Sequence, residues 1–299
     1  MNNIKSIFSI KDLENVSGIK AHTIRIWEKR YALLEPDRIS RNVRTYNYDS
    51  LLKILNIALL NKQGLKISKI AQLTDKEILL KVREHISEEF KNQKALSSLK
   101  LAMYTFDTAL FNKIYEEQMR LHTFSEVFQI VLGPFLNFIG LQWHSKGLNT
   151  AHEHFITNLI YQKIQLNTES LTLDDPVEGQ ATYILYLPEE EMHEIGLMYL
   201  NYELILRGFR TIYLGRSILL EDLVSLKEQL SKIIWISHFT VAPPAEFIIR
   251  YIDKIKKELL KDGDYFWAVS RKFNGVNEQE NPNNFKFLNS LREVVKNLQ

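Results

Sequence analysis

The spacing of hydrophobic and polar positions changes once along the chain. Up to about residue 170, apolar residues recur every three or four positions over most segments, which is the spacing of a helix with one buried face. Beyond residue 180, short continuous apolar runs alternate with helical segments. These two patterns predict a mainly helical first part followed by an α/β part.

The first 75 residues contain short elements. We expect helices over residues 9–17, 21–31, 49–62 and 67–73, and a small β-hairpin within 35–46. Ser9 can cap the first helix, and Gly18 ends it. Two helices joined by a glycine turn and followed by a hairpin are typical of a winged helix-turn-helix, whose second helix enters the major groove of DNA.

The middle of the chain is almost wholly helical from residue 76 to residue 172. The segment Phe124–Gly140 has one wide apolar face, which predicts a helical bundle. The polar segment Asn167–Gln180 contains Pro176 and Gly179 and is expected to be a linker. We therefore predict a DNA-binding domain over residues 1–75 and a helical bundle over 76–172.

The last part, residues 173–299, repeats strand and helix. Apolar runs predict strands at residues 183–187, 211–215, 233–237 and 265–269, with helices up to 206 and over 219–230, 245–260 and 283–297. Strands that are hydrophobic on both faces and alternate with helices predict a parallel, doubly wound, Rossmann-like sheet. The fold class is thus multidomain, α and α/β.

Composition and charge narrow the class of protein. The chain has 299 residues and no cysteine, which excludes disulfides, thiolate catalysis and cysteine-ligated metal sites. Its first residues lack the apolar stretch of a secretion signal, and no apolar run reaches the roughly 18 residues that span a bilayer. We expect a cytoplasmic protein with no membrane partner.

The net charge of +2 is unevenly spread. Residues 1–75 carry 13 Lys and Arg against 7 Asp and Glu, whereas the remainder carries 25 against 29. A basic segment on a slightly acidic body indicates a polyanion partner for that segment.

The second helix and the hairpin hold the residues expected to meet DNA. Ile24 and Trp27 are three positions apart and can pack inward. The side chains left for bases or phosphates are Thr23, Arg25, Lys29 and Arg30 on the helix and Arg38, Arg41 and Arg44 on the wing. Arginine suits phosphate because its planar fork pairs with two oxygens. Tyr46 can either donate its hydroxyl to DNA or pack the wing.

These residues carry a family resemblance. Thr23-Ile24-Arg25, Trp27 to Tyr31, Pro36-x-Arg38 and Arg44-x-Tyr46 resemble the N-terminal module of MerR-family regulators over residues 8–74. The resemblance implies a homodimer on a near-palindromic promoter or operator in double-stranded DNA. The glycine usual at the wing tip is replaced by Asn42 or Val43, and Asn tolerates a left-handed backbone well. The alternative is a helix-turn-helix that binds protein.

A second short motif follows the first strand of the α/β part. Glu191-Met192-His193-Glu194-Ile195-Gly196 lies at the carboxyl end of a parallel strand, where α/β sheets bind ligands. His193 can present one imidazole nitrogen to a metal while Glu191 holds the other. Gly196 would allow a bulky ligand to approach closely. The alternative is an acidic helix start with an exposed histidine.

This motif resembles the Asp-x-His-x-x-Gly signature of cobalamin-binding modules, with Glu191 in place of Asp. Ser237-x-Phe239 falls where that family has Ser-x-Leu beside the slot for the nucleotide tail of the cofactor. In the helical part, Trp143 is followed after nine residues by Glu153-His154, which resembles the Trp-x9-Glu-His motif of light-responsive cobalamin regulators in the MerR family, the CarH/LitR type.

The resemblance implies a specific cofactor site. Adenosylcobalamin would bind between the helical bundle and the α/β domain, with His193 as the lower ligand of cobalt. Trp143, Glu153 and His154 would cover the upper face, and His144 would take the upper position on cobalt after illumination. One departure stands out, because the glycine pair after the fourth strand, against which the tail would lie, is replaced by Val269-Ser270, and Phe239 enlarges the slot wall.

Three functions follow from these patterns. The first is a repressor, a homodimer or homotetramer, whose assembly and DNA affinity respond to adenosylcobalamin and light. The second is a regulator of the same architecture that has lost cobalamin and responds to another ligand or a protein partner. The third is a corrinoid methyltransferase or mutase carrier, for which no length remains beside the DNA-binding module. We find no catalytic motif and expect no enzyme activity.

Overall fold

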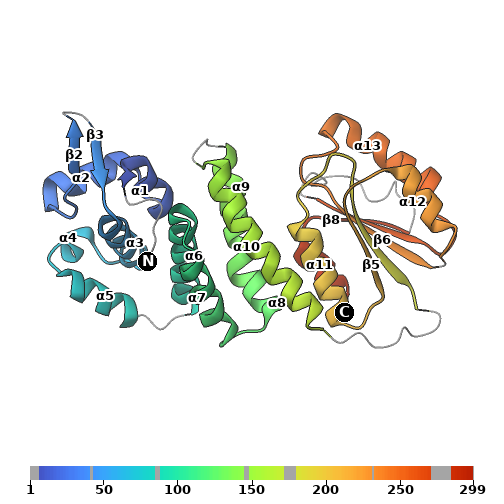
Figure 1. Cartoon of the computed structure of the whole chain (residues 1–299), viewed down its shortest axis with the longest axis horizontal. Helices are drawn as coiled ribbons and strands as arrows, with labels where there is room; N and C mark the ends of the chain where they lie inside the picture. The colour runs from blue at the N-terminus through green and yellow to red at the C-terminus, as the bar shows by residue number, and fades with distance from the viewer. Residues whose placement is uncertain are drawn as a thin grey trace. The chain divides into compact units, whose positions relative to one another are not determined.

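The computed structural model describes residues 7–40, 43–84, 88–144, 148–171, 180–230, 232–270 and 284–298 (Figure 1). The chain divides into two compact units, Met1–Ile160 and Tyr161–Gln299. The boundary falls inside helix α10, Thr150–Glu169. Each unit is described by itself.

The first unit begins with the elements of a winged helix-turn-helix. They are β1 Phe8–Ser9, α1 Ile10–Ser17, α2 Ala21–Tyr31, β2 Asp37–Ser40, β3 Val43–Tyr46, α3 Tyr48–Lys62, α4 Ile67–Ile70 and α5 Asp75–Glu84. The predicted cap is confirmed, because Ser9 and Asp12 form a reciprocal capping box at the start of α1. Gly18 ends α1 with a φ of 76°, which only glycine adopts at little cost.

The wing is a three-stranded antiparallel sheet in the order β1-β3-β2. The hairpin of β2 and β3 was predicted, and its register pairs Arg38 with Arg44. Strand β1 was not predicted, because two residues carry no periodicity. Its pairing of Phe8 with Tyr46 ties the start of the chain to the wing. Phe8 is fully buried there.

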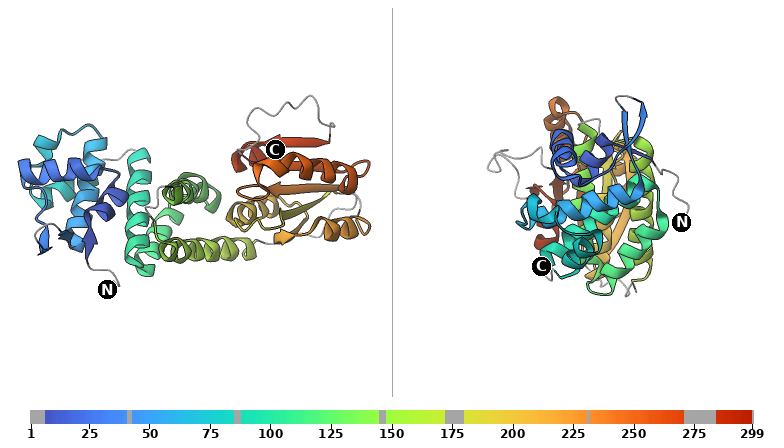
Figure 2. Two further views of the ribbon diagram at one scale, coloured as in Figure 1. Left: turned by 90° about the horizontal axis from the view of Figure 1, so that it is seen from above. Right: turned by 90° about the vertical axis from the view of Figure 1, so that its left-hand side faces the viewer.

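The rest of the first unit consists of helices. They are α6 Glu88–Thr105, α7 Thr108–Met119, α8 Phe124–Val127, the π-helical turn η1 Phe128–Leu132, α9 Gly133–His144 and the first half of α10 (Figure 2). The segment Phe124–Leu141 is long and apolar enough to cross a membrane, with a mean hydropathy of 1.5. Phe124, Phe128 and Phe135 are buried within the unit, as in a core helix.

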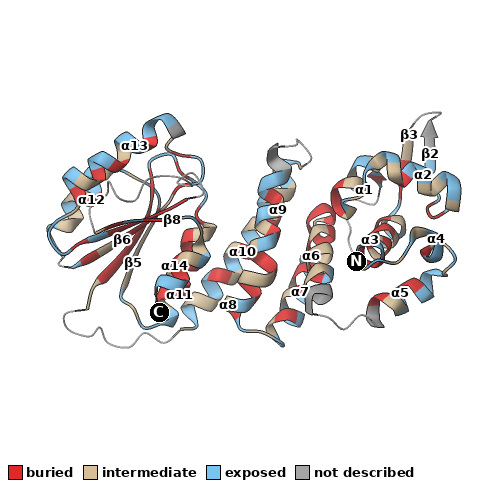
Figure 3. Ribbon diagram, turned by 180° about the vertical axis from the view of Figure 1, so that it is seen from behind, coloured by how far each residue is buried: buried red, intermediate tan, exposed pale blue. Residues whose placement is uncertain are grey.

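The second unit is built on a five-stranded parallel sheet in the order β5-β4-β6-β7-β8. Its elements are β4 Thr182–Pro188, α11 Ile195–Leu206, β5 Thr211–Ile218, α12 Leu220–Lys227, β6 Ile233–His238, α13 Ala245–Lys254, the π-helical turn η2 Ile255–Leu259, β7 Tyr265–Val269, β8 Phe285–Leu288 and α14 Leu291–Asn297. Every residue of the inner strand β4 is buried, as expected for a strand covered on both faces. Figure 3 shows buried residues in red along the strands of this sheet.

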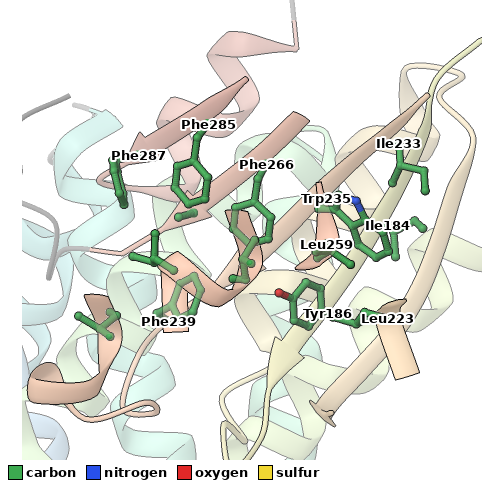
Figure 4. Packing of buried hydrophobic residues seen from close by; sticks show 14 residues of the cluster. Ile184, Tyr186, Leu223, Ile233, Trp235, Phe239, Leu259, Phe266, Phe285 and Phe287 are labelled. Atoms are coloured by element: carbon green, nitrogen blue, oxygen red, sulfur yellow. The ribbon is translucent and has the colours of Figure 1, made fainter. Parts of the chain in front are cut away.

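Successive side chains of each strand point to opposite faces of the sheet. One face packs against α12, α13 and η2 through a cluster rich in aromatic residues, the aromatic cluster hereafter (Figure 4). Its buried members are Ile184, Tyr186, Leu223, Ile233, Trp235, Phe239, Ile248, Ile252, Ile255, Leu259, Phe266, Ala268, Phe285 and Phe287. Helices α11 and α14 contact each other. Helix α11 also contacts β4, β5 and β6, and α14 contacts β8.

The fold class is as predicted: an N-terminal helix-turn-helix, a helical region and a parallel sheet with helices. One element differs. Residues 283–297 were expected to form a single helix, yet Phe285–Leu288 is a fifth parallel strand and only Leu291–Asn297 is helical. The phenyl ring of Phe285 stacks on that of Phe266 in the neighbouring strand at 5.0 Å, and this tertiary contact favours the extended backbone.

Candidate functional site

Helix α2 presents the side chains that were predicted to meet DNA. Arg25, Lys29 and Arg30 are exposed and Thr23 is half-buried. Ile24 is fully buried, and Trp27 packs against the core of the first unit, which confirms that these two face inward. The basic side chains of α2 are therefore available to a polyanion.

The wing holds its arginine and tyrosine against α2. The Tyr46 hydroxyl donates a hydrogen bond to the Glu28 carboxylate, and Arg44 Nε lies 3.4 Å from the other oxygen of the same group. Tyr46 is 1% exposed, so of its two predicted roles the structure shows packing, and its hydroxyl is not offered to DNA. Arg44 remains partly exposed and can reach a phosphate.

The other two arginines predicted on the wing are not described with their side chains. The backbone of Arg38 lies in β2, opposite Arg44, while its side chain and the whole of Arg41 lie outside the described residues.

The second candidate site lies at the carboxyl ends of β4, β5 and β6, which a parallel sheet brings to one edge. Hydrogen bonds join the three loops there. The Glu190 amide donates to the Ser217 hydroxyl at 3.2 Å and links the loop after β4 to the end of β5. The Glu191 carboxylate links the same loop to the loop after β6.

Glu191 is fully buried and accepts six hydrogen bonds within the described residues. Its Oε2 accepts from the successive backbone amides of Thr240, Val241 and Ala242 at 2.9, 2.6 and 3.0 Å. Its Oε1 accepts from the Met192 and His193 amides and lies 2.6 Å from His193 Nδ1. One carboxylate thus fixes two loops and one imidazole.

The charge on Glu191 is stabilised by these donors. Burial by itself would raise the pKa of the carboxyl group, but the hydrogen bonds from His193 and from the Val241 and Ala242 amides outweigh it and lower the pKa to about 2. The carboxylate is therefore ionised at neutral pH. An ionised acceptor beside Nδ1 favours the tautomer that carries the imidazole proton there, in which Nε2 has the lone pair that a metal would need.

The surroundings of His193 fit a metal held in a broad apolar ring. Its side chain is 54% exposed. Exposed apolar side chains stand in the three loops of this edge: Met192 after β4, Leu219 after β5 and Val241 after β6, at 53%, 41% and 61% exposure. An outward imidazole among apolar side chains can receive the cobalt and the lower face of a corrin ring.

Gly196 lies near the start of α11, as predicted, but protein fills the space beside it. A Cβ atom at this position would stand 3.3 Å from the imidazole of His238 and 3.2 Å from Leu291. The close approach that this glycine allows is therefore that of His238, at the end of β6. Burial lowers the pKa of His238 to about 4, so its ring is neutral.

The residues of the expected tail slot are buried, and three of them, Phe239, Val269 and Ser270, are hydrogen-bonded to one another. Ser237 and Val269 are fully buried, Phe239 is 1% exposed and Ser270 3%. The Phe239 amide donates to the Val269 carbonyl at 2.9 Å, and the Ser270 hydroxyl donates to the Phe239 carbonyl at 2.6 Å. The residues at this edge therefore fit a cobalt and a ring, whereas a nucleotide tail inserted between β6 and β7 would have to break these hydrogen bonds.

The predicted residues of the helical part lie on two helices. Trp143 and His144 end α9, and their side chains lie outside the described residues. Glu153 and His154 stand in the first turns of α10, Glu153 half-buried and His154 exposed. Among the described residues, no group of three or more potential metal ligands is gathered in one place.

Sequence patterns missed the backbone donors of Thr240, Val241 and Ala242. They lie about fifty positions from Glu191 in the chain. Every residue except proline has a backbone amide, so the sequence does not indicate which amides act as donors. A partial signal existed, since this loop follows a strand that ends at the same edge as the His193 loop.

Two family models match the chain. MerR HTH family regulatory protein matches residues 8–77. B12 binding domain matches residues 95–166, within the helical part. Both matches agree with the order of modules expected from the sequence.

Two bacterial repressors are similar to most of the chain. HTH-type transcriptional repressor CarH of Myxococcus xanthus is 26% identical over 223 residues, which are 72% of this chain and 73% of that protein. HTH-type transcriptional repressor CarA of the same organism is 26% identical over 209 residues, 69% of this chain and 67% of that protein. Together with the two domain matches, they support a DNA-binding transcription regulator that is similar to CarH, with a helix-turn-helix similar to that of MerR regulators and a region similar to a B12 binding domain.

A solved structure agrees at the level of the fold. The monomethylamine corrinoid protein of Methanosarcina barkeri superposes with a TM-score of 0.53 at 14% identity, over 69% of this chain and 98% of that one. The likeness covers a helical region and a parallel sheet with helices.

Proposed function

We propose that this chain is a transcriptional repressor whose assembly and DNA affinity are controlled by adenosylcobalamin and light. The single observation that carries the cofactor is His193, an exposed imidazole held at Nδ1 by a buried, ionised carboxylate at the ligand-binding edge of a parallel sheet. The B12 binding domain match and the similarity to CarH support the same reading.

The DNA-binding half of the proposal rests on α2 and the wing. Arg25, Lys29 and Arg30 project from α2, and Arg44 stands on β3, which is bonded to the same helix through Glu28. In this arrangement α2 would read the major groove while the wing meets the sugar–phosphate backbone. A homodimer would place two copies of α2 on the two halves of a near-palindromic operator.

The sensing half rests on His193. In this proposal its Nε2 is the lower ligand of cobalt, and Glu191 keeps the ring in the required orientation and tautomer. The family resemblance assigns Trp143, Glu153 and His154 to the upper face and His144 to the cobalt after illumination. When bound, the cofactor would supply a cobalt–carbon bond that light can break. A ligand controls assembly only if its affinity differs between the two assembly states.

The proposal is tested with the purified full-length chain. It is incubated with adenosylcobalamin in darkness, desalted, and its visible spectrum is read before and after green light. We expect a retained corrinoid spectrum that changes irreversibly, and dark-state binding to an operator fragment that illumination weakens. His193→Ala should lose the retained spectrum, whereas His122→Ala, in the turn after α7, should keep it. Retention by His193→Ala would refute the role given to His193.

A second function is favoured by one observation. Phe239, Val269 and Ser270, where the family resemblance puts the nucleotide tail, are buried, and Ser270 is bonded to Phe239, as expected for a regulator that had abandoned cobalamin. Such a protein would bind DNA and answer to another ligand or a protein partner. Failure to retain any corrinoid, together with intact DNA binding, would favour it. Methyl transfer from a bound corrinoid would instead favour the carrier enzyme.

A further inference from the structure

We propose that the site at His193 selects corrinoids that lack a nucleotide tail, of the cobinamide class, over complete cobalamins. This inference rests on the proposed function, because it assumes that His193 binds cobalt. It concerns which corrinoid can bind there, and this depends on whether the carboxyl ends of β6 and β7, beside that histidine, leave room for a nucleotide tail.

The two strand ends leave no passage between them. The parallel pairing of β6 and β7 runs up to His238 and Val269 and is extended by the bond from the Phe239 amide to the Val269 carbonyl. The Ser270 hydroxyl then closes back on the Phe239 carbonyl at 2.6 Å, and the Ser270 amide donates to Leu288 of β8 at 2.9 Å. A tail inserted here would have to break these hydrogen bonds.

Side chains also fill the space between these strand ends and the helices α12 and α13. Phe239 belongs to the aromatic cluster (Figure 4). Its phenyl ring packs edge-on against Tyr251 of α13, with the ring centres 6.0 Å apart. The Tyr251 hydroxyl lies 3.4 Å from that of Tyr186, which is fully buried in β4. Protein interiors are close-packed, so on this face of the sheet a tail could enter only by expelling the Phe239 ring from this cluster.

The chemistry of the two ligands turns this packing into selectivity. In a complete cobalamin free in solution, the terminal base occupies the lower face of cobalt and must be displaced before His193 can bind. A slot for the displaced tail would compensate for that displacement by burying it. Here the tail has no slot, whereas cobinamide has no base to displace and no tail to place. The Glu191–His193 pair and its apolar surroundings serve both ligands equally.

The first experiment compares adenosylcobinamide with adenosylcobalamin on the wild-type full-length chain, because the adenosyl group blocks the upper face of cobalt and leaves only the lower face to His193. Each is equilibrated with the protein by dialysis in the dark, and the bound corrinoid is measured by its absorbance. We expect the dissociation constant for adenosylcobinamide to be at least ~10-fold lower, and His193→Ala to weaken the binding of both.

The second experiment opens the strand ends. The double variant Phe239→Leu, Ser270→Gly removes the ring from the cluster and the hydroxyl from the closing bond. It should raise the affinity for adenosylcobalamin at least ~10-fold and leave that for adenosylcobinamide within about twofold. Phe285→Leu, a substitution of the same kind in β8, should change neither. Circular dichroism checks that both variants fold. If the double variant does not fold, the comparison of the two corrinoids on the wild type still tests the proposed selectivity.

The outcomes separate this inference from the proposed function. Equal affinity of the wild type for the two corrinoids would overturn the selectivity and leave cobalamin control in place. Unchanged cobalamin affinity in a folded double variant would overturn the role of Phe239 and Ser270. If neither corrinoid binds, the inference and cobalamin control both fail, and DNA regulation by another signal is left.

Discussion

Replacing Glu191 by glutamine should loosen two loops and cost substantial stability, although the two side chains have nearly the same shape. The amide can offer its oxygen either to Thr240, Val241 and Ala242 or to the donors around His193, but not to both. Its NH₂ group then faces N–H groups that have lost their acceptor. Leaving buried donors unsatisfied costs about 1–3 kcal/mol each.

The magnitude can also be obtained from the pKa. Folding lowers the pKa of Glu191 from 4.5 to about 2, and each unit corresponds to about 1.4 kcal/mol, so the ionised carboxylate contributes roughly 3 kcal/mol at neutral pH. Because the folded-state pKa is the lower one, this contribution is complete above pH 4.5 and is lost as the pH falls toward 2. The difference between wild type and Glu191→Gln should therefore be about 3 kcal/mol at pH 7 and less than about half of that at pH 3.

Two assays check this without any corrinoid. Urea unfolding at both pH values gives the difference in free energy, and hydrogen exchange reports the amides of Thr240, Val241 and Ala242, which should lose protection at pH 7. Asp264→Asn is the matched control, since Asp264 is also buried and caps the backbone of Ile233, but at the opposite end of β6. Retained protection at 240–242, or equal stability of wild type and Glu191→Gln at pH 7, would refute the reasoning.

Three smaller perturbations follow from the same structure. Gly196→Ala should lower the free energy of unfolding by about 1 kcal/mol, because the new methyl group presses on His238; a denaturant midpoint equal to that of the wild type would contradict this. Tyr46→Phe should cost about 1 kcal/mol through the lost bond to Glu28, measured by thermal unfolding, with operator affinity nearly unchanged; a large loss of affinity would show that its hydroxyl meets DNA after all. Arg25→Ala should reduce the salt dependence of DNA binding by about one phosphate contact, and an unaltered slope would remove Arg25 from the interface.

The sequence was sufficient for the elements whose order is set by local periodicity. The helix-turn-helix, the four strands β4 to β7 and the capping of α1 by Ser9 all followed from apolar spacing and turn chemistry. Strand β8 did not, because Phe285–Leu288 is only four residues long and owes its extended form to the Phe266 ring across the sheet. The sequence of such a strand has little hydrophobic pattern that would predict it, because the strand is stabilised by a residue from elsewhere in the chain.

The candidate site was predictable in its side chains and not in its backbone. The spacing of Glu191 and His193 correctly anticipated the bond between them. The positions of the three amides that bind the other carboxylate oxygen depend on how the loop after β6 turns. The residue types of this loop do not predict that turn. For Gly196, the motif suggested room for a ligand, and the fold uses that room for His238. Chain topology decided which of these possibilities is realised.

The pairing of Phe8–Ser9 with β3 has a practical consequence for handling the protein. β3 is the middle strand of the wing, so the residues just before α1 form one of its two borders. Shortening the chain to begin at the first helix would strip that border, expose the backbone of Thr45 and Tyr46, and invite strands of other molecules to add there. A purification tag is better joined through a spacer ahead of residue 7 than fused directly at Phe8, where it would lie against the strands of the wing.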